Sequence, residues 1–92
     1  MIRAVVITER AKKDLRFVPA RVLDKFEAWV QFVESIGLEE TRKIPGFHDE
    51  PLKGKRKGQR SIRLNRAYRA FYVVKQDSIE FVSVEEVVKH EY

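Results

Sequence analysis

Residues 59–88 read QRSIRLNRAYRAFYVVKQDSIEFVSVEEVV, and this stretch decides the fold. In its first part, Ile62 and Leu64 alternate with polar residues, which is typical of a strand with one face in water. Two further apolar runs, YRAFYVVK and SIEFVSVEEVV, are separated by the residues QDS, which favour a turn. The stretch therefore predicts three consecutive strands in an antiparallel meander.

The N-terminal half has a strand followed by helical periodicity. Residues 2–7, IRAVVI, predict a short strand covered on both faces, or nearly so. Thr8 can cap a following helix, and Pro19 suits the first turn of a second helix that Gly37 ends. The second helix carries an apolar stripe at helical spacing: Val22, Phe26, Trp29, Val30, Val33 and Ile36. Residues 38–51 connect the halves and have room for one more helical turn.

The predicted fold class is α+β. Helices and strands are segregated along the chain in the order β-α-α-β-β-β, which predicts an antiparallel sheet with an N-terminal helical hairpin packed on one face. A chain of 92 residues is too short for two cores, so we expect one domain spanning residues 1–92. We also expect a cytoplasmic protein, because there is no Cys and no apolar run suited to a signal peptide or a membrane span.

The net charge of +5 is concentrated in one block of the sequence. Residues 51–75 contain nine Lys and Arg and no Asp or Glu, whereas residues 1–50 contain nine of each sign. A charge run is usually a solvated face. A surface that serves only solubility carries positive and negative charges side by side, however, and this block carries only positive ones. The block therefore favours a surface that binds a polyanion.

Few residues could serve the familiar classes of enzyme. The sequence has no Cys nucleophile, no Gly-rich phosphate loop and no HExxH motif, and its two histidines, His48 and His90, are far apart. We expect neither a metal nor another cofactor. Cleavage of RNA by its own 2′-OH requires only a base, an acid and cations around the phosphorane. Composition thus indicates a polyanion binder that could be a metal-free nuclease.

Residues 52–92 resemble the C-terminal half of toxins of the RelE/ParE superfamily, particularly the HigB-like and RelE-like ribonucleases of bacterial toxin–antitoxin pairs. The matching parts are LKGKRKGQRSIRL, the run YRAFY at the place of the family's YR(L/I)(V/I)Y strand, and KHEY at the C-terminus. The predicted order of elements agrees with the fold of that family. The resemblance implies an mRNA interferase that cuts message in the ribosomal A site and that a cognate antitoxin holds inactive.

The resemblance also implies roles for single residues. Arg69 stands at the strand arginine that contacts the scissile phosphate, and Arg63 stands at a basic residue that stabilises the same charge. His90 and Tyr92 stand near a C-terminal His or Tyr used for stacking or proton transfer. The residues expected to bind RNA are Lys53, Lys55, Arg56, Lys57, Arg60 and Arg66.

Two alternatives stay open on the sequence. RelE-like enzymes have a lysine where this chain has Ser61, so the general base is either His90 or Glu50. The chain is also either a nuclease, a ParE-like inhibitor of DNA gyrase, or an RNA-binding member of the fold without catalysis. The titratable end KHEY favours the nuclease. A binding module alone would need exposed aromatic residues, for which the candidates are Tyr68, Tyr72 and Tyr92.

Overall fold

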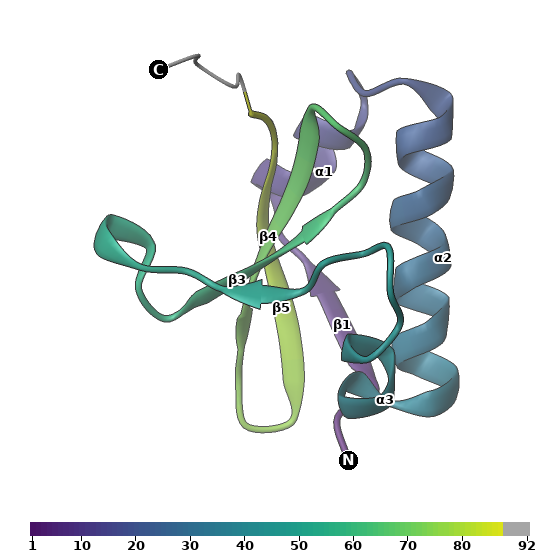
Figure 1. The fold of residues 1–92 in the computed structure, drawn as a ribbon, viewed down its shortest axis with the longest axis vertical. Helices are drawn as coiled ribbons and strands as arrows, with labels where there is room; N and C mark the ends of the chain where they lie inside the picture. The colour runs from purple at the N-terminus through teal and green to yellow at the C-terminus, as the bar shows by residue number, and fades with distance from the viewer. Residues whose placement is uncertain (88–92) are drawn as a thin grey trace.

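The computed structural model describes residues 1–87, which form one five-stranded sheet and three helices (Figure 1). In chain order the elements are β1 (Ala4–Ile7), α1 (Glu9–Leu15), α2 (Ala20–Ile36), α3 (Leu38–Arg42), β2 (Glu50–Pro51), the 3-10 turn η1 (Gly54–Arg56), β3 (Gln59–Arg63), β4 (Tyr68–Val74) and β5 (Ser78–Glu86). The strand order is β1-β5-β4-β3-β2. Only β1 runs parallel to its neighbour, and the other pairs are antiparallel. The predicted α+β class is confirmed, and α3 lies in the connection where the sequence had room for one more helical turn. The structure adds the two-residue strand β2, and the sheet is mixed instead of wholly antiparallel because β1 runs parallel to β5.

The helix ends follow from local chemistry. The Thr8 side chain accepts a hydrogen bond from the backbone N–H of Ala11 at 3.1 Å, so it caps α1 as predicted. Pro19 is the N-cap of α2 and precedes its first turn. Gly37 ends α2 with a φ of 88°, a conformation that glycine adopts without the steric penalty of a side chain. Among residues 1–87, no helix is both long and apolar enough to cross a membrane.

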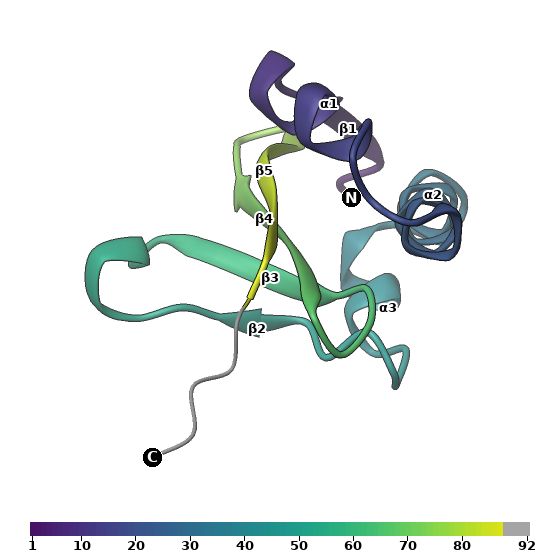
Figure 2. The same cartoon turned by 90° about the horizontal axis from the view of Figure 1, so that it is seen from above.

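The core lies between α2 and strands β4 and β5. Figure 2 shows α1 beside β1 at the edge of the sheet, with α2 lying apart from it. Phe26 and Trp29 of α2 pack against Tyr72 of β4 and Phe81 of β5. The ring centroids of Phe26 and Phe81 are 4.7 Å apart, and those of Trp29 and Tyr72 are 5.3 Å apart. Burial of each such side chain contributes about 1.5–3 kcal/mol, so this aromatic cluster fixes α2 on the sheet.

The prediction that residues 2–7 form a strand covered on both faces is wrong. Val5 and Ile7 pack against the core, whereas Ala4 and Val6 are exposed. The physical reason is position, because β1 is an edge strand and pairs only with β5. An apolar run is equally compatible with one covered face or two.

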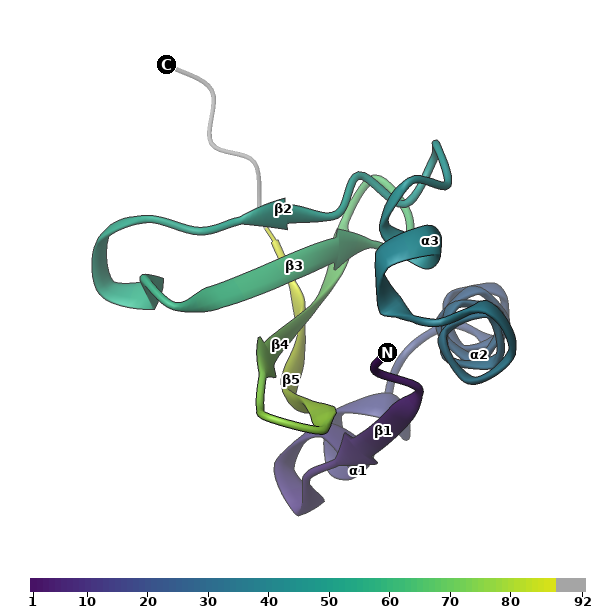
Figure 3. The ribbon, with the colours of Figure 1, turned by 90° about the horizontal axis from the view of Figure 1, so that it is seen from below.

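Figure 3 shows β2, β3 and the loop between them extending away from the helices. This loop carries η1 and most of the lysines of the basic block. The fold therefore presents the basic block beside the sheet face that the helices leave uncovered.

Candidate functional site

The register of β2 to β5 places two rows of side chains on the face of the sheet away from the helices, which we name the outer face. Residues paired across a ladder lie on the same face, and alternate residues face the other side. The first row comprises Arg63, Arg69 and Glu85. The second row comprises Glu50, Ser61, Phe71 and Ser83. Between the rows, Ile62, Ala70 and Val84 are buried in the core.

Arg69 is held at the centre of the outer face. Its Nη1 donates a hydrogen bond to Ser61 Oγ at 3.0 Å and lies 3.5 Å from Glu50 Oε1. The Ser61 side chain is buried, whereas the Glu50 side chain is 51% exposed. The site thus combines a fixed guanidinium with a carboxylate that a ligand can reach.

Arg63 and Arg69, for which the resemblance implied roles at one phosphate, are direct cross-strand partners. Side chains at such positions have Cβ atoms about 4.5–5.5 Å apart, and like charges there destabilise the sheet. Among residues 1–87, Arg63 forms no ion pair. An anion between the two guanidinium groups would relieve this repulsion, so the pair is suited to bind a phosphate.

Arg56 differs from the other basic residues of its loop. Lys53, Lys55 and Lys57 are exposed, but the Arg56 guanidinium lies 3.9 Å from the centroid of the Phe71 ring. It donates hydrogen bonds from Nη1 to Gln59 Oε1 at 3.0 Å and from Nη2 to Glu85 Oε2 at 2.5 Å. Arg56 therefore docks the basic loop onto the outer face.

The Arg56–Glu85 pair predicts a pH dependence of stability. Burial by itself would raise the pKa of Glu85, but hydrogen bonds from Ser83 and Arg56, together with the Arg56 charge, lower it below its ordinary value. Ionised Glu85 therefore stabilises the fold above the unfolded-state pKa, and this stabilisation is lost as pH falls through the folded-state pKa. Urea denaturation from neutral pH down to about pH 3 should show that Glu85→Gln loses less stability on acidification than the wild type. Equal losses would contradict this role of Glu85.

Arg60 lies on the other side of β3, facing the core. Its Nε donates to Asp49 Oδ1 at 2.7 Å, and the Tyr72 hydroxyl donates to Asp49 Oδ2 at 2.5 Å. Burial alone would lower the pKa of Arg60, but the hydrogen bond and charge of Asp49 raise it. Burial, followed by the contact with Asp49, raises the pKa of Tyr72, so its hydroxyl stays a donor.

This cluster corrects two expectations. Arg60 was predicted to bind RNA, yet its side chain is only 22% exposed and is paired with Asp49 on the core side, so we assign it a structural role. Tyr72 is fully buried, so it cannot be a stacking platform. The signal that could have indicated both is the two-residue period, because positions 60 and 72 share a face with Ile62 and Ala70.

Removing Asp49 should destabilise the protein strongly. The Asp49 side chain has no exposed surface, so Asp49→Ala leaves Arg60 and the Tyr72 hydroxyl without their acceptor. Breaking a buried ion pair in this way typically costs about 3–5 kcal/mol. Urea denaturation should show this loss, whereas Asp77→Ala, in the exposed turn before β5, should change the free energy of unfolding by less than about 0.5 kcal/mol. Equal effects of the two substitutions would show that the Asp49 cluster contributes little.

The other predicted residues lie in loops or outside the described residues. Arg66 is exposed in the loop between β3 and β4, and His48 is exposed in the loop before β2. His90 and Tyr92 lie outside the described residues. Sequence reasoning missed Phe71, Gln59, Ser83 and Glu85 as neighbours of the candidate site.

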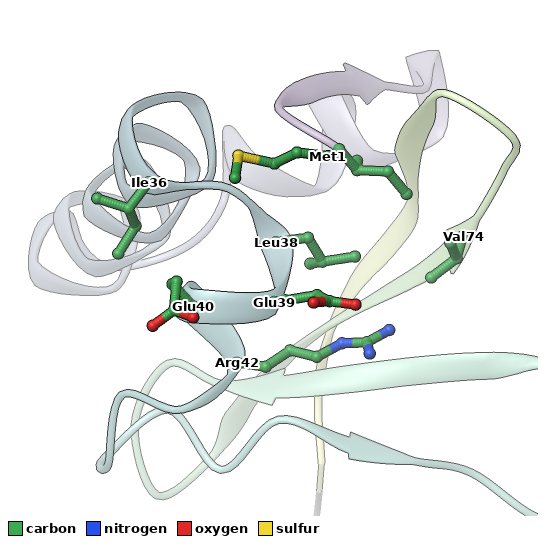
Figure 4. A pocket seen from close by; sticks show the side chains of 8 residues that line it. Met1, Ile36, Leu38, Glu39, Glu40, Arg42 and Val74 are labelled. Atoms are coloured by element: carbon green, nitrogen blue, oxygen red, sulfur yellow. The ribbon is translucent and has the colours of Figure 1, made fainter.

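A pocket of about 490 Å³ lies where α3 approaches Met1 and Val74 (Figure 4). Its lining is largely apolar, with Glu39, Glu40 and Arg42 among the residues that surround it. No predicted site residue lines this pocket. The outer face, which is open, is therefore the better candidate site.

Comparison with known proteins supplies the fold family. The sequence matches no protein-family model, and no curated protein matches it. Among solved structures, a YoeB/ParE toxin from Agrobacterium tumefaciens superposes with a TM-score of 0.73 at 22% identity, covering 92% of this chain and 99% of that one. The YoeB–YefM complex from Staphylococcus aureus matches with a TM-score of 0.70 at 18% identity, over 91% of this chain and 95% of that one.

The toxin–antitoxin complex RelBE2 from Mycobacterium tuberculosis is also similar, with a TM-score of 0.62 at 25% identity over 94% of this chain and 99% of that one. These matches span nearly the whole length of each chain, and they confirm the family resemblance of residues 52–92 at the level of the fold. The chain has the fold of the RelE/ParE toxin superfamily.

Proposed function

We propose that this chain is the toxin of a bacterial toxin–antitoxin pair and that it cleaves messenger RNA on the ribosome. One observation carries the proposal: Arg69, fixed by Ser61 beside the reachable carboxylate of Glu50, lies directly opposite Arg63 on the outer face. This arrangement offers two cations for one phosphate and a base next to them. The solved structures of similar fold, described as toxins and toxin–antitoxin complexes, support it.

The proposed chemistry needs no cofactor. Glu50 removes the proton of the 2′-OH, and the 2′-oxygen attacks the adjacent phosphorus while the bond from phosphorus to the 5′-oxygen breaks. Arg69 and Arg63 stabilise the charge that grows on the phosphorane. An acid, which we assign to His90 or Tyr92, returns a proton to the departing 5′-oxygen. The products are a 2′,3′-cyclic phosphate and a 5′-hydroxyl.

Of the two general bases that the sequence left open, Glu50 and His90, Glu50 is the better candidate. Its carboxylate lies 3.5 Å from the guanidinium that would hold the phosphate, and about half of its side chain is exposed. A base must reach the proton that it abstracts, and a 2′-OH next to a phosphate on Arg69 would lie near Glu50. His90 or Tyr92 then serves as the acid.

The exposed lysines would hold the rest of the RNA. Lys53, Lys55 and Lys57 are exposed on the loop between β2 and β3, and Arg66 is exposed in the loop between β3 and β4. Such contacts are with phosphates, so they contribute affinity that falls with salt and no sequence preference. The same uncovered basic face would bind an acidic segment of an antitoxin.

A second candidate is a toxin that inhibits DNA gyrase through protein contact. The observation that favours it is the match to a structure described as a YoeB/ParE toxin. Such an inhibitor has no need of a carboxylate beside a pair of arginines, so Glu50 favours the nuclease.

The test is to induce the protein in bacterial cells and to map the ends of messages by primer extension. We expect codon-spaced cuts that disappear in Arg69→Ala. Growth arrest with intact message and altered DNA supercoiling would instead support the gyrase inhibitor and contradict the nuclease.

A further inference from the structure

Arg56 is held as a flat surface beside the phosphate-binding pair. One face of its guanidinium lies on the Phe71 ring, with the central carbon 3.9 Å from the ring centroid. Two of its edges are fixed by the hydrogen bonds to Gln59 and Glu85. Glu85 is in turn fixed by the Ser83 hydroxyl, which donates to it at 2.7 Å. The plane of the guanidinium is therefore set before any ligand binds.

The inner face of this plane is covered, but 35% of the Arg56 side chain is exposed. Phe71 covers one face of the guanidinium, and Gln59 and Glu85 occupy two of its edges, so the face turned away from Phe71 is the one left for a ligand. Phe71 itself is buried, with 6% exposure, so the flat surface that the site offers to a ligand is that of Arg56.

The position of this plane relative to Arg69 matches one nucleotide. Phe71 and Arg69 are two residues apart on β4 and face the same way, which separates their Cα atoms by about 7 Å. A phosphate bound between Arg63 and Arg69 would place a neighbouring base above the Phe71–Arg56 stack. Unpaired bases of RNA stack on aromatic rings and on arginine planes.

We propose that the Arg56 guanidinium, stacked on Phe71, is the platform on which one base of the RNA stacks next to the cleaved phosphate. The proposal rests on the proposed function, because it needs RNA as the ligand of Arg63 and Arg69. It assigns to Arg56 a role that differs from phosphate contact. Contact with a phosphate requires only a positive charge, whereas stacking on a base requires a planar group.

Two substitutions separate these roles. Arg56→Lys keeps the charge and loses the plane, and Arg56→Tyr keeps a plane and loses the charge. The platform predicts that Tyr supports cleavage better than Lys, while phosphate contact predicts the reverse order. Lys57→Ala is the matched control, because Lys57 is an exposed basic neighbour on the same loop.

The experiment measures single-turnover cleavage of a short message, both free and on programmed ribosomes. Each nucleotide that flanks the cut is replaced in turn by an abasic one. Stacking of one base on a side chain is worth about 5- to 100-fold in binding. We expect Arg56→Lys to cleave intact RNA more slowly than the wild type by a factor in this range. On the RNA that lacks the stacking base, Arg56→Lys and the wild type should cleave at the same rate. The control variant should slow intact and abasic substrates equally.

The proposal is overturned if Arg56→Lys cleaves as fast as the wild type, or if it loses the same factor on intact RNA and on every abasic RNA. Urea denaturation of each variant identifies any loss of rate that results from unfolding. Phe71→Leu, which removes the ring under Arg56, provides a second test: it too should slow cleavage of intact RNA and leave unchanged the cleavage of RNA that lacks the stacking base. If the proposed function is wrong, the result differs, because the wild type would then cleave neither the free message nor the message on ribosomes.

Discussion

Replacing Arg69 by Ala should lower the rate of RNA cleavage by about 100- to 1,000-fold, the usual cost of losing one donor to a developing negative charge. The guanidinium is fixed by Ser61 and lies opposite Arg63, so its donors are already aimed where the phosphorane would form. Affinity for RNA should fall much less, because Lys53, Lys55 and Lys57 still contact phosphates. Single-turnover cleavage and equilibrium binding of the same RNA measure the two effects.

Arg66→Ala is the matched control for this substitution. Arg66 is an exposed arginine only three positions away, but it lies in the loop between β3 and β4 and not in the rows of the outer face. It should weaken binding slightly and leave the single-turnover rate at saturating RNA unchanged. The role of Arg69 would be contradicted if both variants lost affinity and rate by the same factors. Loss of the Ser61 contact should cost about 1–3 kcal/mol of stability, because the buried Ser61 hydroxyl loses its partner, and urea denaturation checks that Arg69→Ala stays folded.

Replacing Glu50 by Gln should slow cleavage by about 100- to 10,000-fold, which is the range for loss of a general base. Gln has nearly the same size but carries no charge, so the shape of the outer face is kept while the proton acceptor and the ion pair with Arg69 are lost. Rapid-quench measurement of the single-turnover rate checks this expectation.

Glu86→Gln provides the comparison, since Glu86 is an exposed carboxylate at the end of β5 whose position alternates with that of Glu85. It should cleave like the wild type. If Glu50→Gln retained the wild-type rate, the general base would be elsewhere, and the alternative named from the sequence is His90.

The features that the sequence predicted correctly are those set by short-range pattern. The two-residue period predicted β3, β4 and β5, and the cross-strand position of Arg63 and Arg69 follows from a meander with a short turn. Thr8 caps the start of α1 through a hydrogen bond, and Gly37 ends α2 because of its backbone conformation, so both boundaries have local causes.

What the sequence did not predict depends on contacts between distant segments. Arg56 reaches Glu85, 29 positions away, and nothing near either residue in the sequence indicates this ion pair. Asp49 is equally inconspicuous in its loop, and its burial results from the packing of β3 and β4 against residues before β2. A run of basic residues cannot show by composition which of them point outward, and Arg60 was misassigned for that reason.

The chemistry of the RNA ends tests the central claim, that the outer face cleaves RNA by attack of the neighbouring 2′-OH. Message cleaved by the purified protein would be analysed by mass spectrometry of the new 3′ ends, in parallel with the same message treated with Arg69→Ala. The predicted result is a 2′,3′-cyclic phosphate made by the wild type and almost absent with Arg69→Ala. A 3′-hydroxyl end, or a cyclic phosphate produced equally by both proteins, would contradict the claim.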